Sequence, residues 1–517
     1  MSTDTNNKPY WLFWIVLAVM AAVFPVFAWH ENTAGFLTDD GMYLLMADFF
    51  SPYYNANHHI QQFIIVQARF PPAFPVLIAL FGGGSANMAA AHLVTCATFL
   101  VSGVMLYLWA RRTLASRELA VACLAIYALL PKTLVYVTEI WSEFLYMALV
   151  LAVLVLLDIA ARSASPRRVR ETLCAAALFI GVAVLTRTIG VALFAAFLVF
   201  LVLHPVRQRY LYVLIAVSLP VFWQVVKAVN GYGGGYTEDL EKYFSMSGIQ
   251  VLLLDDIPAN ASLLLASWGR HFALTPAASW PLQAASLLLL ILALAGAAQR
   301  AMNHRPDVHY AAVYLVIVLV WPYPEHNTRF LYPLIPLVLV YLFIGANLIA
   351  GAAGGPVQRH ARAALVLGLL ALVYPNAVFV VDRFHEPVPD HIPGDYRHTR
   401  HWLRGHDIER IHHEADQKAT VIRLLQRTRR HFGRRQCVYS AHPISTMLYS
   451  DRISIIVPRT VSIERLWVCR YLIAVNLRTV YEPNYPLHDV DRDRLRLLDA
   501  ERDHRGVPQA FLFEINR

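Results

Sequence analysis

Two adjacent carboxylates, Asp39 and Asp40, lie in the stretch GFLTDDGMYLLMADFF, shortly after the first apolar segment of the chain. One of them, or Thr38, is expected to cap a helix that begins near Gly41, because such side chains accept hydrogen bonds from free backbone N–H groups. Adjacent helical residues point about 100° apart, so two neighbouring acids rarely share one task. A carboxylate that is partly desolvated at a membrane edge can also take a proton from a hydroxyl. The pair therefore predicts a helix cap beside a general base.

Four arginines lie near the ends of apolar segments, where a guanidinium can bind a phosphate: Arg69, Arg187, Arg270 and Arg329. Arg69 stands before the Pro-Pro pair of ARFPPAFPVLIALFGG, which fixes the backbone and prevents a helix from running through it. Arg187 lies in VLTRTIGV, and Arg329 lies in EHNTRFLYPLIPLVLVY. Arginines commonly snorkel at membrane boundaries, but interfacial arginines are also functional candidates. Together the four predict a basic pocket for an anionic head group.

Glu139 and Glu143 stand four residues apart in YVTEIWSEFLYM and are expected to share one face of a helix. The helix dipole favours acids at a helix N-terminus, which accounts for them without any chemistry. Alternatively, Glu143 joins Asp39 or Asp40 around a divalent metal ion, with His58 or His59 as a further ligand. His58 and its neighbour His59 can equally be solvated loop residues. The sequence leaves a divalent metal open as a cofactor.

The composition indicates that membrane helices position these residues. Hydrophobic residues make up 57% of the 517 residues and charged residues only 15%, whereas a typical soluble domain has about 25% charged residues. Apolar runs near twenty residues recur, long enough to cross about 30 Å of hydrocarbon as helix. We expect about eleven transmembrane helices, the first of them retained rather than cleaved as a signal peptide. Their approximate limits are 11–29, 86–110, 118–137, 143–161, 172–187, 189–204, 211–228, 280–299, 309–323, 330–350 and 363–382.

Loop charge predicts the orientation of these helices. Arginines gather in one set of loops, which by the positive-inside rule places the N-terminus in the cytoplasm. An odd number of spans then places the C-terminal tail outside the cytoplasmic (inner) membrane. Two outer segments, 30–85 and 229–279, exceed ordinary connections and carry amphipathic stretches, so we expect interfacial helices that wall a cavity. The stretch 172–204 can be one long helix or a tight pair.

Residues 1–382 are therefore predicted to form an all-α polytopic membrane module, and residues 383–517 a small α/β domain outside the membrane. In this tail, ADQKATVIRLLQRTRRHF has helical periodicity, whereas QCVYSA and RISIIVP resemble short strands. Cys437 and Cys469 also lie in the tail and can pair in an oxidising compartment. Their spacing alone does not establish the pair.

The order of these motifs resembles the GT-C superfamily of membrane glycosyltransferases, in the branch of protein O-mannosyltransferases and lipid A aminoarabinose transferases. The resemblance covers roughly residues 8–382. It rests on one helix before an outer loop with Asp-Asp in place of the usual Asp-Glu, followed by RFPPAFPVLIALFG, LTRTIGV and RFLYPLIPL.

The resemblance implies inverting transfer of a sugar from a polyprenyl-phosphate donor to an acceptor hydroxyl of a glycan, lipid or protein, at the outer face of the membrane. It implies Asp39 as the general base, with Asp40 beside it. It implies Arg69 as a ligand of the donor phosphate, where relatives often carry lysine. Glu143 matches an acid at the outer start of the fourth helix.

Other functions stay open on the sequence alone. A polytopic transporter or a lipid-binding scaffold without transferase activity would also carry many spans and interfacial charges, although transporters often show inverted repeats, and the sequence shows none. The net charge of +9 does not indicate a nucleic-acid partner, because the loop arginines that set topology account for it. P-loop and dinucleotide-binding fingerprints are absent from the sequence.

Overall fold

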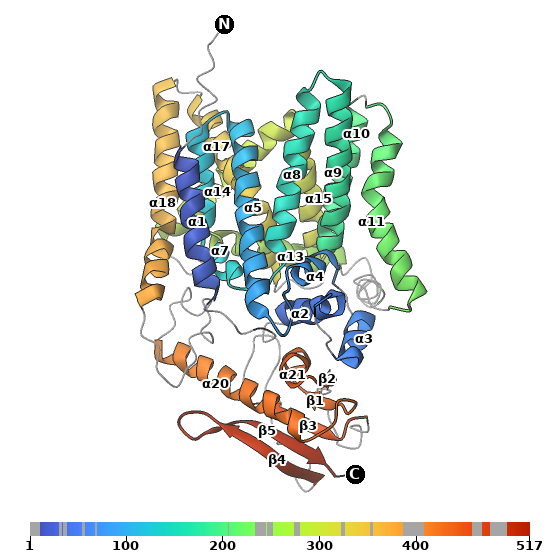
Figure 1. Ribbon diagram of the computed structural model, residues 1–517. Helices are drawn as coiled ribbons and strands as arrows, with labels where there is room; N and C mark the ends of the chain where they lie inside the picture. The colour runs from blue at the N-terminus through green and yellow to red at the C-terminus, as the bar shows by residue number, and fades with distance from the viewer. Residues whose placement is uncertain are drawn as a thin grey trace.

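A computed structural model of the chain shows a bundle of long helices joined to a smaller unit of helices and strands (Figure 1). The structure describes residues 11–29, 34, 39–53, 57–67, 70–204, 206–232, 245, 252–272, 280–321, 326–351, 355–385, 408–456, 468–475 and 494–516. Helix α1 (Trp11–Trp29) begins at one end of the bundle, and the smaller unit lies beyond the opposite end (Figure 1). We call residues 408–516 the C-terminal unit.

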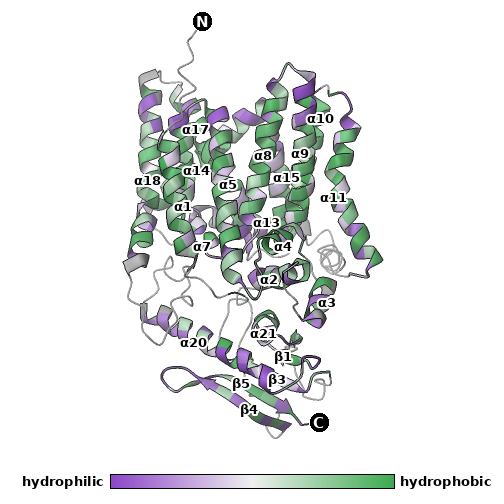
Figure 2. Ribbon diagram, viewed as in Figure 1, coloured by the Kyte–Doolittle hydropathy of each residue, from purple (hydrophilic) through white to green (hydrophobic). Residues whose placement is uncertain are grey.

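The bundle consists of apolar helices, as Figure 2 shows by their hydropathy. They are α1 (Trp11–Trp29), α5 (Met88–Leu114), α6 (Arg117–Leu129), α7 (Pro131–Val137), α8 (Glu143–Arg162), α9 (Pro166–Thr186), α10 (Val191–Leu203), α11 (Arg209–Val229), α14 (Trp280–Met302), α15 (Pro306–Leu319), α17 (Ile335–Gly351) and α18 (Gly355–His385). Among the described residues, seven helices are long and apolar enough to cross a membrane, or eight if the bent pair α6–α7 forms one span. Three shorter apolar helices accompany them. Each of the eleven predicted segments coincides with a helix or a run of consecutive helices, whereas the number of spans stays a prediction.

Two predicted segments depart from straight helices. The segment 118–137 is bent by 63° between α6 and α7, because Pro131 begins α7 and cannot continue the hydrogen bonds of α6. The segment predicted as one helix is therefore two helices, which together can form one span. In the stretch 172–204, a short 3₁₀ turn, η2 (Thr188–Gly190), separates α9 from α10. The tight pair is therefore the correct alternative.

Helices α14 and α17 pack closely through two glycines. A Cβ atom on Gly296 would lie 2.1 Å from the carbonyl oxygen of Tyr341, and one on Gly345 would lie 2.0 Å from that of Leu292. Neither position accepts a side chain unless the helices separate. Small residues that let two backbones approach are typical of helix contacts in membranes.

Short helices cover the end of the bundle nearest the C-terminal unit (Figure 1). The segment 30–85 contains α2 (Asp39–Phe50), α3 (His58–Gln67) and α4 (Ala73–Leu80). The segment 229–279 contains a π-helical turn, η3 (Leu252–Asp256), and α13 (Ile257–Arg270). Helix α16 (Asn327–Leu331) and the 3₁₀ turn η5 (Tyr332–Leu334) lead into α17. Residues 70–72, which include the Pro-Pro pair, are not helical, whereas Arg69 itself lies outside the described residues.

The C-terminal unit combines α20 (Ile408–Arg427), a 3₁₀ turn η7 (Thr428–Arg430) and α21 (Pro443–Ser450) with one sheet. Its strands are β1 (Val438–Ser440), β2 (Ser454–Ile456), β3 (Tyr471–Val475), β4 (Leu495–Arg502) and β5 (Pro508–Ile515). The sheet order is β2-β1-β3-β5-β4, with β1 parallel to β2 and β3 and the other pairs antiparallel. The predicted helix and the two predicted strands are α20, β1 and β2, which confirms a small α/β unit. Because 386–407 lie outside the described residues, the domain boundary at 382 stays a prediction.

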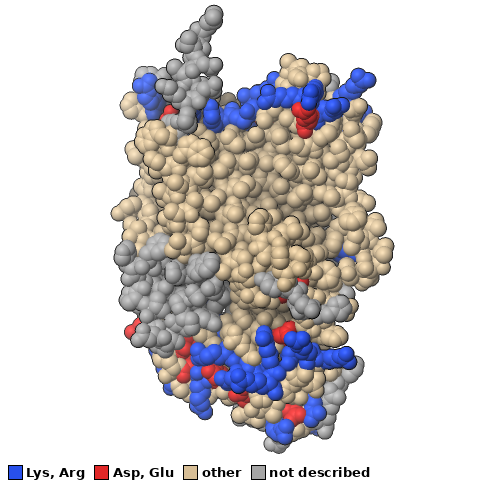
Figure 3. Space-filling view, in the orientation of Figure 1, with Lys and Arg blue, Asp and Glu red and all other residues tan. Residues whose placement is uncertain are grey.

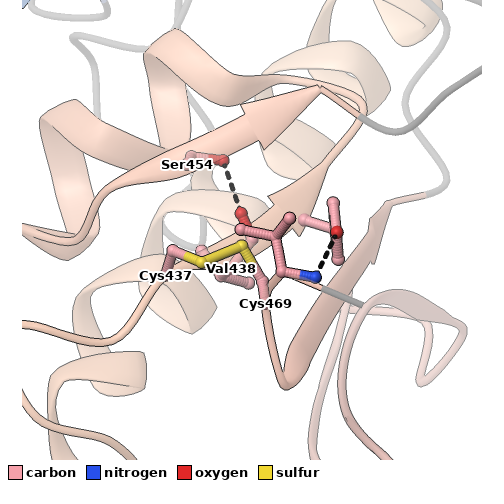
Figure 4. The surroundings of a disulfide bond; sticks show 6 residues. Cys437, Val438, Ser454 and Cys469 are labelled. Atoms are coloured by element: carbon pink, nitrogen blue, oxygen red, sulfur yellow. Dashed lines mark hydrogen bonds between the residues drawn. A yellow bond between two sulfur atoms is a disulfide. The ribbon is translucent and has the colours of Figure 1, made fainter. Parts of the chain in front are cut away.

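A disulfide joins Cys437 to Cys469, next to the parallel strands β1 and β3 (Figure 4). Beside it, the Ser454 hydroxyl donates to the Val438 carbonyl at 3.2 Å, which connects β2 to β1. The disulfide therefore ties the start of β1 to the segment that precedes β3.

The C-terminal unit packs directly on α2. Leu44 and Met46 of α2 belong to the same buried cluster as Leu425 of α20 and Met447 of α21. The Tyr449 hydroxyl donates to the Ala34 carbonyl at 3.0 Å and accepts from its N–H at 3.1 Å. A cavity of about 230 Å³ remains between α2, α3 and this unit, lined by Asp48 and Asp451 among others.

A candidate active site of paired acids and arginines

An alternating chain of acids and arginines lies at the end of the bundle covered by α2. The Asp39 carboxylate pairs with Nη1 of Arg329. The Nε of Arg329 pairs with Oε1 of Glu143, and Nη1 of Arg187 reaches the same oxygen at 2.7 Å. Four residues predicted from separate motifs thus form one cluster, which we call the Asp39–Arg187 cluster.

Four different elements position these side chains. Asp39 is the first residue of α2, and Glu143 is the first residue of α8. Arg187 follows α9 in extended backbone, at φ −149° and ψ 133°, where the helix gives way to η2. Arg329 lies in α16, before the proline-containing turn that starts α17. Each charge therefore sits where a helix begins or breaks, which is how polar groups reach an otherwise apolar bundle.

The Asp39–Arg187 cluster is buried and electrically balanced. The Glu143 side chain is fully buried, and those of Arg187 and Arg329 are 12% and 13% exposed. Asp39 is 19% exposed and is the most accessible of the four. The two negative charges balance the two positive charges. Buried charges need such partners, because the cost of removing them from water must be repaid by their mutual attraction. The accessible Asp39 can meet a substrate, while Glu143 cannot.

An aromatic ring contacts Arg329 and a hydroxyl group contacts Arg187. The guanidinium of Arg329 lies 4.0 Å from the ring centre of Trp141, a cation–π contact. The Ser142 hydroxyl contacts Nη1 of Arg187 at 3.4 Å and the Tyr43 hydroxyl at 2.9 Å. Burial raises the pKa of Tyr43, so its hydroxyl stays protonated.

The sequence analysis did not predict Tyr43, Trp141 and Ser142 as site residues. Their positions in the sequence nevertheless contain a signal for each. Tyr43 follows Asp39 by four residues and so shares its helix face. Trp141 and Ser142 immediately precede Glu143 in the motif that was singled out for its acids.

The neighbouring acids Asp39 and Asp40 face different partners. Asp40 is 2% exposed, and its Oδ1 accepts the backbone N–H of Gly41 at 2.8 Å. Asp39 instead contacts Arg329. One acid thus bonds to the first turn of α2, and the other points to an arginine of the cluster.

Several predicted residues lie elsewhere. Arg270 is exposed at the end of α13 and makes no ion pair with the described part of the chain. Arg69 lies outside the described residues, and so does the side chain of His58, which begins α3. Glu139 and Glu143 do not share a helix face, because the chain leaves helix between α7 and α8 and Glu139 lies in that bend. That expectation was wrong.

The predicted metal site has no counterpart in the described residues. No group of three or more His, Cys, Asp or Glu side chains there is placed to hold a metal ion. Glu143 contacts Arg187 and Arg329 instead. The metal role of Glu143 and His58 stays a prediction.

Comparison with known proteins agrees with this architecture. The family model described as dolichyl-phosphate-mannose-protein mannosyltransferase matches residues 70–226, which include Glu143 and Arg187. No curated protein sequence matches the chain. The crystal structure of ArnT from Cupriavidus metallidurans in the apo state has a TM-score of 0.54 at 14% identity and covers 96% of this chain and 97% of that one. The same protein bound to undecaprenyl phosphate gives the same values.

A second likeness points to the same class of fold. The oligosaccharyltransferase of Archaeoglobus fulgidus in the apo form has a TM-score of 0.53 at 12% identity and covers 91% of this chain and 70% of that one. At these identities, the two likenesses show a shared fold. The chain therefore has the fold of the GT-C superfamily of membrane glycosyltransferases.

Proposed function

We propose that the chain is a membrane glycosyltransferase that moves a hexosyl or pentosyl group from a polyprenyl-phosphate donor to an acceptor hydroxyl, with inversion. The observation that carries this proposal is the Asp39–Arg187 cluster, in which one accessible acid stands beside two buried arginines. The likeness to ArnT, which has been crystallised with undecaprenyl phosphate, supports a lipid-phosphate donor. The acceptor is a glycan, a lipid or a protein.

The two arginines supply the phosphate-binding half of the site. Arg187 and Arg329 share one oxygen of Glu143, so their remaining N–H groups are held close together. When a phosphate binds them, they stabilise the negative charge that develops as the sugar–phosphate bond breaks. Glu143 is then a positioning residue. Arg69 and Arg270 are predicted as further ligands of the donor phosphate.

Asp39 supplies the other half. In the structure it contacts Arg329, and a donor phosphate on that arginine competes with this contact. Asp39 then accepts the proton of the acceptor hydroxyl, whose oxygen attacks the anomeric carbon from the face opposite the phosphate. The new bond joins this oxygen to the carbon, and the polyprenyl phosphate leaves with the electron pair of the broken bond. Asp40 holds the first turn of α2 beside it.

We place the site and the C-terminal unit on the outer side of the cytoplasmic membrane, with the N-terminus inside. The arginine-rich loops support this orientation. The disulfide of the C-terminal unit is also expected in an oxidising compartment.

Reconstituted protein tests the catalytic assignment. A panel of undecaprenyl-phosphate monosaccharides is supplied in proteoliposomes, and release of undecaprenyl phosphate is measured. We expect Asp39→Asn to lower turnover by about 10²–10⁴-fold, the usual contribution of a general base. Asp255→Asn removes an exposed acid of η3 at the same end of the protein and is expected to keep wild-type turnover. Unchanged turnover in Asp39→Asn excludes the base assignment.

Binding of undecaprenyl phosphate, measured without any sugar, tests the phosphate half separately. We expect Arg187→Gln and Glu143→Gln to weaken it, and Asp39→Asn to retain it. A protein that binds the lipid through these arginines but releases none from any donor would be a lipid-binding scaffold rather than a transferase.

A further inference from the structure

A second charged cavity lies at the other end of the bundle. It measures about 100 Å³ and is enclosed by the last turns of α5, α8, α10 and α14 and by the start of α15. Its charged lining residues are Asp158, Arg162, Arg300, Arg305 and Asp307. Glu143 begins α8 and Arg162 ends it, so at 1.5 Å per residue this cavity lies about 28 Å from the Asp39–Arg187 cluster. That distance is close to the thickness of the hydrocarbon core.

Ion pairs hold the walls of this cavity in place. Both carboxylate oxygens of Asp307 accept from Arg300, at 2.6 and 2.5 Å, and the Asp307 side chain is 1% exposed. Asp158 pairs with Arg112 at 2.8 Å and with Arg162 at 2.7 Å. Both acids are therefore neutralised by partners of their own.

Positive charge remains after these pairs are counted. The charged lining residues and Arg112, which pairs with Asp158, together comprise four arginines and two aspartates. Their net charge is +2. Arg305 makes no ion pair with any described residue, and Arg162 shares its acid with Arg112. His204 stacks on Phe200 at 4.1 Å, and both line the cavity. Arg305, which has no ion pair among the described residues, and Arg162, which shares its acid, thus border a cavity with a partly aromatic wall.

We propose that this cavity binds the phosphate of an anionic lipid head group from the leaflet at that end of the bundle. The cavity holds several times the volume that one water needs, which suits a phosphate group. Basic pockets between helix ends bind such head groups in other membrane proteins. Figure 3 shows a band of Lys and Arg at this end, and basic residues beside a membrane attract anionic lipid head groups. This inference goes beyond the proposed function, because it concerns the opposite face of the membrane.

Orientation rules alone do not account for the cavity. The positive-inside bias requires only that arginines occupy loops, and the exposed Arg207 and Arg209 satisfy it without lining this cavity. Arg300, by contrast, is only 15% exposed and its carboxylate partner is buried. Its guanidinium also lies 5.7 Å from the ring of Trp109, another residue of the wall.

Native mass spectrometry of the full chain in detergent tests the proposal. Phosphatidylglycerol and phosphatidylcholine with identical acyl chains are titrated against wild type and two double variants. The cavity variant carries Arg162→Gln and Arg305→Gln. The control carries Arg207→Gln and Arg209→Gln, which removes the same charge from the same end of the bundle. Arg305→Gln alone breaks no ion pair among the described residues and covers the case in which the double variant fails to fold.

We expect wild type to prefer phosphatidylglycerol. Each arginine near a lipid surface contributes about a fivefold gain in affinity, so the cavity variant is expected to lose about 30-fold and Arg305→Gln alone about fivefold. The control is expected to stay near wild type. Equal binding of the two lipids overturns the proposal, and so does an equal loss in the control.

Inorganic phosphate distinguishes the source of the bound group. If millimolar phosphate displaces phosphatidylglycerol, the cavity recognises the phosphate itself. If it does not, while binding still depends on Arg162 and Arg305, the cavity recognises the phosphate as part of a lipid. Retention of phosphatidylglycerol by the cavity variant at wild-type affinity overturns both versions.

Discussion

Glu143 is the residue on which the geometry of the candidate site depends. Arg187 and Arg329 repel each other, and both contact the same Glu143 oxygen. Removing one partner from a buried ion pair leaves an uncompensated charge, at a cost of about 3–5 kcal/mol. The acid therefore keeps two cations adjacent and ready for a phosphate. No sequence pattern gives Glu143 this role, because its partners lie on other helices.

Asp48, at the far end of α2, makes stability depend on pH. Burial raises its pKa to about 6, with a further contribution from Asp451, although Ser85 donates to it. The folded chain therefore holds this proton more tightly than the unfolded chain. The stabilisation is complete below pH about 4 and is lost as pH rises through about 6, at most about 3 kcal/mol. Arg429 and Arg434 line the same cavity.

We expect Asp48→Asn to unfold at a higher temperature than wild type at neutral pH and to match it near pH 4. Asparagine keeps an oxygen that accepts the Ser85 N–H. Thermal unfolding in detergent across this pH range provides the measurement. Parallel pH profiles for the two proteins would contradict the assignment.

The types of the site residues were predictable, and their contacts were not. Asp39, Arg187 and Arg329 stand at the ends of apolar segments, where charged residues are candidates for a functional site. Arg329 of α16 contacts Asp39 of α2, which is 290 residues away in the sequence. The periodicity of hydrophobic residues within a segment does not predict a contact over that distance. Glu139 and Glu143 do not share a helix face, because residues four apart lie on one face only inside a continuous helix.

Breaks between helices position the site at the scale of elements. The turn η2 directly follows Arg187, and the bend at α6–α7 precedes Trp141 and Glu143 in the chain. Pro131 marks the first break in the sequence, but the prediction ran one helix through it from 118 to 137. The strands β3, β4 and β5 were not predicted. In β4, charged and apolar residues mix in LRLLDAER without the alternation that is typical of a strand.

The contact between α14 and α17 depends on its glycines. We expect Gly345→Ala to destabilise the protein by about 1–3 kcal/mol, because the new methyl group meets the Leu292 carbonyl. Gly368→Ala is the matched control, since nothing lies within 4 Å of its Cβ, and alanine is the better helix former. Thermal unfolding of both variants decides the point. Equal stability of the two variants would show that the helices are not in this close contact.

At the scale of the whole molecule, the C-terminal unit is fixed to the membrane part. Tyr449 bonds to the backbone of Ala34, and the shared buried cluster joins α2 to α20 and α21. The tail could be predicted as an α/β unit from its composition, but its attachment to α2 could not.

The disulfide provides a test of orientation. We expect Cys437→Ser to make the C-terminal unit more sensitive to protease, with a loss of about 2–4 kcal/mol. In intact spheroplasts, the protease should reach this unit from outside. Cys174→Ser, which removes a free cysteine of α9, is the control. Protection of the C-terminal unit in spheroplasts, with cleavage only after lysis, would reverse the orientation.

The ion pair between Asp39 and Arg329 also constrains how the protein is made. Its partners are 290 residues apart, and ribosomes add about 5–20 residues per second. About 15–60 s of synthesis therefore separate the emergence of α2 from that of α16. During this interval the growing chain has inserted most of its helices without the contact that completes its site. A nascent chain that stalls before Asn327 therefore lacks Arg329 and the contact that this arginine makes with Asp39 in the full chain.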